Sequence, residues 1–89
     1  MDFTWDEAKD ASTLAERGFG FAFALRIFAG RVLEQHDARR DYGEVRIRAI
    51  GAAESYVLVV IYTDRHDGRR IISARLANRK EKQLWDTSA

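Results

Sequence analysis

The sequence predicts an α+β fold: two N-terminal helices, an antiparallel sheet of four or more strands, and a short C-terminal helix. Helix signals fill the first third of the chain, the apolar pattern then changes to a period of two, and a further helix signal follows residue 77. Helices and strands that are segregated along a chain are typical of α+β folds. The 89 residues suffice for one domain, 1–89, and are too few for two.

The N-terminal segment predicts a short strand followed by a helix. Residues 2–5 are compatible with the strand. Asp6 is a suitable N-cap for a helix that runs to about Arg17, because its carboxylate can accept from the first free N–H groups. Gly18 is a suitable stop, since glycine readily adopts the left-handed conformation that ends helices.

A second helix is predicted from about Gly20 to Gly30. Within residues 21–29 only Arg26 is polar, and a helix that is apolar on every side is buried on more than one side. Two interpretations remain open. Either the helix packs wholly within the core, or a partner covers part of it near Phe23.

The remainder of the chain predicts strands and a closing helix. Asn78 and Glu81 have the spacing of a capping box, which opens the C-terminal helix. His66-Asp67-Gly68 is a turn signal between two strands. The expected strands are Arg31–His36, Glu44–Ile50, Tyr56–Thr63 and Arg70–Ala77, with a polar turn at Asp37–Tyr42.

Alternation assigns side chains to the two sheet faces, because successive side chains of a strand point in opposite directions. We expect helices to cover one face and to leave the other open for function. In the first alternating strand the two sets are Val45, Ile47 and Ala49 against Glu44, Arg46 and Arg48. In the last strand they are Ile72, Ala74 and Leu76 against Ile71, Ser73 and Arg75.

Composition limits the classes of function. The net charge is only +1, yet residues 65–82 hold seven bases against two acids. Such a local basic field can attract an anionic partner, although it can equally be ordinary solvated surface. The chain has no cysteine, which excludes thiolate zinc sites, and we predict neither metal nor cofactor. Residues 1–6 lack a secretion signal and no apolar run approaches 18 residues, so we expect a cytoplasmic protein without a membrane segment.

Arginines on the predicted open face suit phosphate recognition, because a guanidinium stays charged and offers planar, bidentate donors. Aromatic side chains could stack on unpaired bases of RNA. Surface salt bridges to Glu44, Glu54 and Glu81 are the alternative explanation of the arginines. The candidate stacking residues are Tyr42, Tyr56, Tyr62 and Trp85.

From residue 3 to residue 85 the chain resembles the BrnT toxins. The most specific segment is Arg70-Ile71-Ile72-Ser73-Ala74-Arg75, and Trp5-Asp6-Glu7-Ala8-Lys9 stands at the expected place. Further matching segments are Tyr42-Gly43-Glu44-Val45-Arg46 and Val60-Ile61-Tyr62-Thr63. The chain departs from the family at Arg17, where many relatives have histidine. Arginine hardly gives up a proton and cannot replace a histidine acid or base.

The resemblance implies a RelE-like fold and a ribonuclease that inhibits translation. It also implies a BrnA-like antitoxin with a ribbon-helix-helix domain, through which the complex binds operator DNA. For metal-independent cleavage of RNA, the catalytic candidates are Arg46, Arg75, Ser73, Glu81 and Glu44. The candidate substrate-binding residues are Lys9, Arg17, Arg48 and Arg70. Two alternatives remain: a non-catalytic module that binds nucleic acid or protein, and a degenerate toxin that acts only in operon autoregulation.

Overall fold

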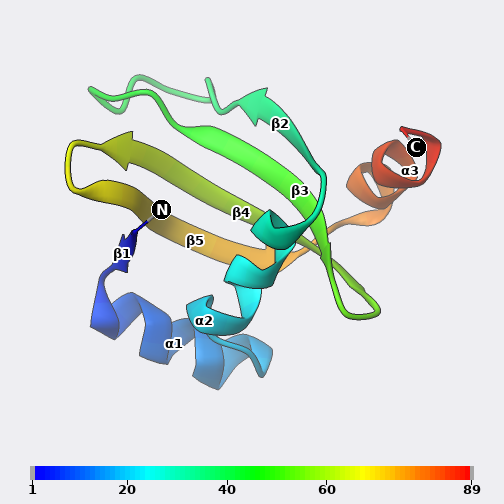
Figure 1. Cartoon of the computed structure of the whole chain (residues 1–89), viewed down its shortest axis with the longest axis horizontal. Helices are drawn as coiled ribbons and strands as arrows, with labels where there is room; N and C mark the ends of the chain where they lie inside the picture. The colour runs from blue at the N-terminus through cyan, green and yellow to red at the C-terminus, as the bar shows by residue number, and fades with distance from the viewer. Residues whose placement is uncertain (1, 89) are drawn as a thin grey trace.

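The computed structural model describes residues 2–88. It has α+β architecture, with a five-stranded sheet and with helices near both ends of the chain (Figure 1). The strands are β1 Phe3–Trp5, β2 Val32–His36, β3 Ile47–Ala53, β4 Tyr56–Arg65 and β5 Gly68–Leu76. The helices are α1 Glu7–Arg17, α2 Phe21–Ala24, the 3₁₀ helix η1 Leu25–Ala29 and α3 Arg79–Thr87. Within residues 2–88 no helix is both long and apolar enough to cross a membrane.

The sheet order is β1-β5-β4-β3-β2. The pairs β2–β3, β3–β4 and β4–β5 are antiparallel, as predicted, and they are joined in chain order. The short edge strand β1 pairs with β5 in parallel, which the sequence analysis did not anticipate. This pairing places the start of α1 beside β5, so that α1 runs along one edge of the sheet (Figure 1).

The predicted second helix is not one α-helix. Only α2 is α-helical, and the chain continues as η1. Phe21, Ala24 and Ile27 are fully buried and stand three residues apart, which matches the three residues per turn of a 3₁₀ helix. The tighter winding of η1 keeps Ile27 against the sheet, on the same side as Phe21 and Ala24 of α2.

A carboxylate from α1 caps α2. Gly20, the N-cap residue, has no side chain that could accept a hydrogen bond from the first N–H group of α2. Asp10 Oδ1 accepts from Phe21 N instead, at 2.7 Å. This bond joins the first turn of α1 to the start of α2. The chain can therefore reverse within the three residues 18–20.

The predicted strand Glu44–Ile50 was placed about three residues too early, since β3 begins at Ile47. Val45, expected in the core, is 61% exposed. The segment before β3 is irregular, and its carbonyl at Val45 is bonded by the Thr63 hydroxyl at 2.7 Å rather than by a strand. Ile47 and Ala49 do face the core, as predicted.

A β-bulge in β5 corrects the predicted alternation of the last strand. Ile61 lies opposite Ser73 and Tyr62 lies opposite Ile71, so Ile72 is an extra residue. Ile71 and Ala74 therefore share the core face, whereas Ile72 packs on the opposite face with Ile61. An extra residue of this kind shifts the side-chain alternation by one place.

The core lies between the sheet and the segment α2–η1. Its fully buried side chains include Phe21, Ile27, Leu58 and Val60. Gly51 of β3 allows η1 to approach closely, because a Cβ atom at that position would lie 2.7 Å from Cβ of Ile27. A second, smaller cluster on the other face joins Ile50, Val59 and Ile61 to Trp85 of α3, so α3 covers part of that face.

We predict that Gly51→Ala destabilises the protein by ~1–3 kcal/mol, the usual cost of forcing extra volume into a packed core. Gly30→Ala is the matched control, because a Cβ atom there would meet no atom within 4 Å. Urea unfolding of both variants tests the expectation. Equal stability of the two variants would contradict the close approach of η1 to β3.

Candidate functional site

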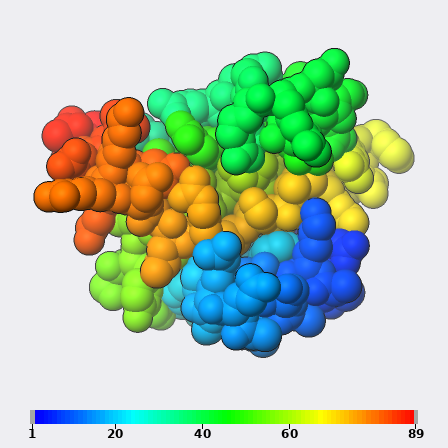
Figure 2. Space-filling view, turned by 180° about the vertical axis from the view of Figure 1, so that it is seen from behind, coloured from blue at the N-terminus to red at the C-terminus, as the bar shows by residue number. Residues whose placement is uncertain are grey.

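We call the sheet face opposite α2 and η1 the open face; Figure 2 views the molecule from that side. Strand register places Arg48, Ser73 and Arg75 side by side on it, with Arg70 further along β5. Arg48 and Ser73 both pair with Ile61, from the two neighbouring strands, and Arg75 pairs with Val59. Ile61 and Val59 belong to the cluster on this face. The bulge determines the arrangement, since without it Ile71 would share the face with Ser73.

Glu81 organises the end of the open face nearest α3. Its carboxylate accepts two hydrogen bonds from Arg75, of 2.7 and 2.8 Å, and lies 3.5 Å from Arg48 Nη1. Glu81 Oε1 also accepts from Asn78 N at 2.9 Å, and Asn78 Oδ1 accepts from Glu81 N, which completes the predicted capping box. One carboxylate therefore both starts α3 and binds two arginines.

The ionisation of this cluster follows from its contacts. Hydrogen bonds from Arg75 lower the pKa of Glu81 to about 2, against an opposing effect of burial. The same bonds raise the pKa of Arg75. Both groups are thus charged at neutral pH, and the side chain of Glu81 is only 5% exposed. A carboxylate of such low pKa is a weak base, because proton transfer is most efficient when the pKa lies near the working pH.

A groove of about 310 Å³ lies at the other end of the open face, between α1 and the sheet. We call it the α1–sheet groove. In Figure 2 the loop before β3 (green) and α1 (blue) flank β5 (yellow to orange). It is lined by three cationic side chains, by serine and threonine hydroxyls, and by the apolar side chains of Ile61 and Ile72. Its polar lining residues are Lys9, Ser12, Thr13, Arg39, Arg46 and Ser73.

Arg46 reaches the α1–sheet groove from the residue just before β3. Its guanidinium lies over the Tyr42 ring at 3.9 Å, an arrangement in which the ring face attracts the cation. Glu44 Oε2 lies 3.6 Å from Nε, an atom that is buried without a hydrogen-bond partner among the described residues. Glu44 also binds Arg65 at 3.1 Å. Glu44 and Arg46, predicted on one face of a strand, therefore lie close together; Arg46 lines the groove, and Glu81 binds neither of them.

Arg39 was missed by the sequence analysis, which treated residues 37–42 only as a polar turn. Asp37 is buried and holds Arg39 through two hydrogen bonds, of 2.8 and 3.0 Å. These bonds lower the pKa of Asp37 and leave the Arg39 side chain 72% exposed over the groove. The Asp-x-Arg spacing in a polar turn was the available signal, since a short acidic side chain can anchor an arginine two residues later.

The remaining candidates lie outside these two clusters. Arg17 is exposed at the end of α1, and Arg70 lies on the open face opposite Thr63, further along β5. Among the described residues neither forms an ion pair. The alternative explanation of the arginines holds in part, since Glu44, Glu54 and Glu81 each bind at least one arginine.

The aromatic residues proposed for base stacking are mostly engaged within the protein. Tyr62 is buried on the helix-covered face, where its hydroxyl donates to Glu34 and burial raises its pKa. Arg31 lies 3.7 Å over the Trp85 ring. Tyr42 carries Arg46 on its ring, and only Tyr56 is well exposed. Tyr62 therefore cannot stack on a base.

We predict that Glu81→Gln lowers the free energy of unfolding at pH 7 by about 2–3 kcal/mol, the size expected from the lowered pKa of a buried carboxylate. The folded-state pKa lies below the unfolded value, so the contribution is complete above about pH 4.5 and is lost as the pH falls towards 2. Urea unfolding of both proteins from pH 7 to pH 2.5 measures it. A stability difference that stays constant over this range would contradict the assignment.

The comparisons with known proteins agree with the resemblance seen in the sequence. The model of a family described as "Ribonuclease toxin, BrnT, of type II toxin-antitoxin system" matches residues 5–81. No curated protein matches the chain. The matched range contains α1, the whole of β2 to β5 and the first turn of α3, and with them both clusters of the open face. Because the match covers far more than half of the 89 residues, the chain belongs to the BrnT family of type II ribonuclease toxins.

Proposed function

We propose that this protein is a metal-independent endoribonuclease that binds RNA in the α1–sheet groove and thereby inhibits translation in the cytoplasm. One observation carries the proposal. The groove is lined by Lys9, Arg39 and Arg46, and the carboxylates that hold the two arginines, Asp37 and Glu44, are not among its lining residues. A concave site with several cations and hydroxyl donors suits a phosphodiester.

The proposed reaction is attack of a ribose 2′-OH on the adjacent phosphorus. The 2′ oxygen forms the new P–O bond, the P–O5′ bond breaks, and the products are a 2′,3′-cyclic phosphate and a 5′-hydroxyl. The 2′ proton goes to a base, and the 5′ oxygen receives a proton from an acid. Negative charge on the phosphorane is stabilised by cations that are already in place.

We assign the charge stabilisation to Arg46, with Lys9 and Arg39 holding the neighbouring phosphate oxygens. Ser73 lines the same groove and can donate a hydrogen bond to the phosphate. Glu44 is the proposed base, because its carboxylate lies 3.6 Å from Arg46 Nε at the edge of this site. Any acid that protonates the 5′ oxygen would come from the lysine or from solvent.

Arg75 and Arg48 have a different proposed role. Because Glu81 already binds both, we do not assign the charge stabilisation to them. They would bind the RNA strand next to the scissile phosphate, with Arg75 positioned by Glu81. Arg70 extends this cationic track along β5. The alternative function is a non-catalytic binding module, because an arginine already bound by a carboxylate stabilises a phosphorane less than an unpaired arginine does. Cleavage assays separate the two functions.

We further propose that the antitoxin encoded in the same operon neutralises the toxin. A BrnA-like partner would carry a ribbon-helix-helix domain and bind operator DNA, with the toxin attached through the antitoxin. This expectation rests on membership of a toxin–antitoxin family. It requires a surface on the toxin for the partner, separate from or overlapping the RNA site.

We predict that Arg46→Ala reduces the rate of cleavage of a labelled RNA by ~10²–10³-fold, as expected for removal of one preorganised charge donor. Arg26→Ala is the matched control, because Arg26 binds Glu54 at the surface and is not among the residues that line the groove. The assay is run with EDTA. Circular dichroism first establishes that each variant is folded.

Arg75 requires a paired substitution, because Arg75→Ala alone would leave the buried Glu81 carboxylate without its main partner. In Arg75→Ala/Glu81→Gln we expect weaker RNA binding with the chemical step largely retained. Loss of activity in EDTA would contradict the metal-independent mechanism. Full activity of Arg46→Ala would remove the reaction from the α1–sheet groove.

A further inference from the structure

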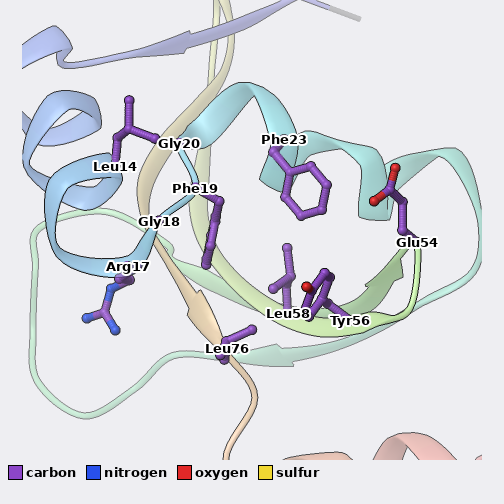
Figure 3. Close-up of a pocket in the computed structure, with 10 residues that line it drawn as sticks. All are labelled: Leu14, Arg17, Gly18, Phe19, Gly20, Phe23, Glu54, Tyr56, Leu58 and Leu76. Carbon is purple, nitrogen blue, oxygen red and sulfur yellow. The ribbon is translucent and has the colours of Figure 1, made fainter.

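A second hollow of the molecule is apolar and lies apart from the open face. It has a volume of about 470 Å³ and lies where the end of α1 and the start of α2 meet the start of β4 and the end of β5 (Figure 3). We call it the apolar groove. Leu58 is the buried part of its lining, and Phe19 and Phe23 point into it in Figure 3. Its apolar lining residues are Leu14, Phe19, Phe23, Tyr56, Leu58 and Leu76.

Exposed apolar side chains are concentrated at this groove. The large hydrophobic residues exposed within residues 2–88 are Leu14, Val45, Tyr56, Leu76 and Leu84, and three of these five line it. Leu14, Tyr56 and Leu76 are each more than half exposed. They come from α1, β4 and β5, so the fold brings them together from distant parts of the sequence. A contiguous apolar patch of this kind marks an interaction site more often than scattered residues do.

The rim of the groove carries a net positive charge. Arg17 stands at one end and Glu54 at the other (Figure 3). Glu54 is neutralised by Arg26 at 2.8 Å, whereas Arg17 forms no ion pair with any residue between 2 and 88. A segment that fills the groove would therefore gain from a carboxylate placed beside Arg17.

We propose that the apolar groove binds an amphipathic segment of the antitoxin, whose apolar side chains lie on Leu14, Tyr56 and Leu76 and whose carboxylate pairs with Arg17. The inference rests on the proposed toxin–antitoxin function and adds the place and chemistry of the contact. It also gives Arg17 a role that differs from substrate binding. Phe23 lines this groove, and one interpretation of the sequence had a partner cover the helix near this residue.

The test uses the purified antitoxin from the same operon and measures its affinity for the intact toxin by calorimetry. Leu76→Gln and Leu14→Gln should each weaken binding by about tenfold or more, the scale at which interface residues count as significant. Leu84→Gln is the matched control, because Leu84 is exposed on α3 and does not line the apolar groove. Leu14 lies on the surface of α1, so its substitution remains informative even where Leu76→Gln fails to fold.

The charge contact has its own test. Arg17→Gln should weaken binding at low salt and much less at 1 M salt, where exposed charges are screened. Lys82→Gln, an exposed cation of α3, should have no such effect. RNA cleavage by Leu14→Gln should equal that of the unmodified toxin, because Leu14 does not line the α1–sheet groove.

Three outcomes would overturn the inference. An antitoxin that binds all the groove variants as tightly as the unmodified toxin places the contact elsewhere and leaves the proposed function intact. Absence of any complex with the unmodified toxin contradicts the partner itself. A toxin that dimerises alone, and becomes monomeric as Leu76→Gln in light scattering, has a second copy of the chain in the groove.

Discussion

The extra residue Ile72 in β5 is the constraint on which the arrangement of this molecule depends. Before it, β5 pairs with β1 and contributes Ile71 to the core. After it, Ala74 takes over the core position, and Ser73 and Arg75 come to the open face. A strand without the bulge would send its second half to the wrong faces, because a shift of one residue reverses every side chain. Core and candidate site are thus made compatible by a single residue.

The open face has two ends with different charge balance. At the α3 end, Glu81 forms ion pairs with Arg75 and Arg48. The same carboxylate therefore compensates the charge of the arginines and caps α3. At the α1 end, Lys9 and the exposed Arg39 line the groove, and no carboxylate is among its lining residues between 2 and 88. Asp37 lies below Arg39 and anchors it without covering it. The two arginines of the α1 end are therefore paired with separate carboxylates that do not line the groove, whereas the two arginines of the α3 end share Glu81.

Local patterns in the sequence predicted much of the fold. The β4–β5 turn at His66-Asp67, the capping box of α3 and the buried strand β4 follow from short-range rules of turn, cap and burial. The bulge, the parallel pairing of β1 and the 3₁₀ winding of η1 were not predictable in this way. They depend on contacts between distant segments, such as the approach of Ile27 to Gly51. For the site, alternation gave the shared face of Arg48, Ser73 and Arg75, but neither the burial of Glu81 nor the Asp37–Arg39 pair.

The loop that connects β2 to β3 is held together at its base by hydrogen bonds that do not involve the residues at its tip. Asp37 N donates to Arg46 O at 2.8 Å, and the Thr63 hydroxyl holds the carbonyl of Val45. Residues 38–45 therefore form a loop whose two ends are held together by the bond between Asp37 and Arg46. Doubling the length of such a loop costs only about 0.6 kcal/mol in closure entropy. Residues inserted between Arg40 and Asp41 would thus lengthen the tip that overhangs the α1–sheet groove at little cost in stability, while the closed base keeps Arg46 and the sheet in place.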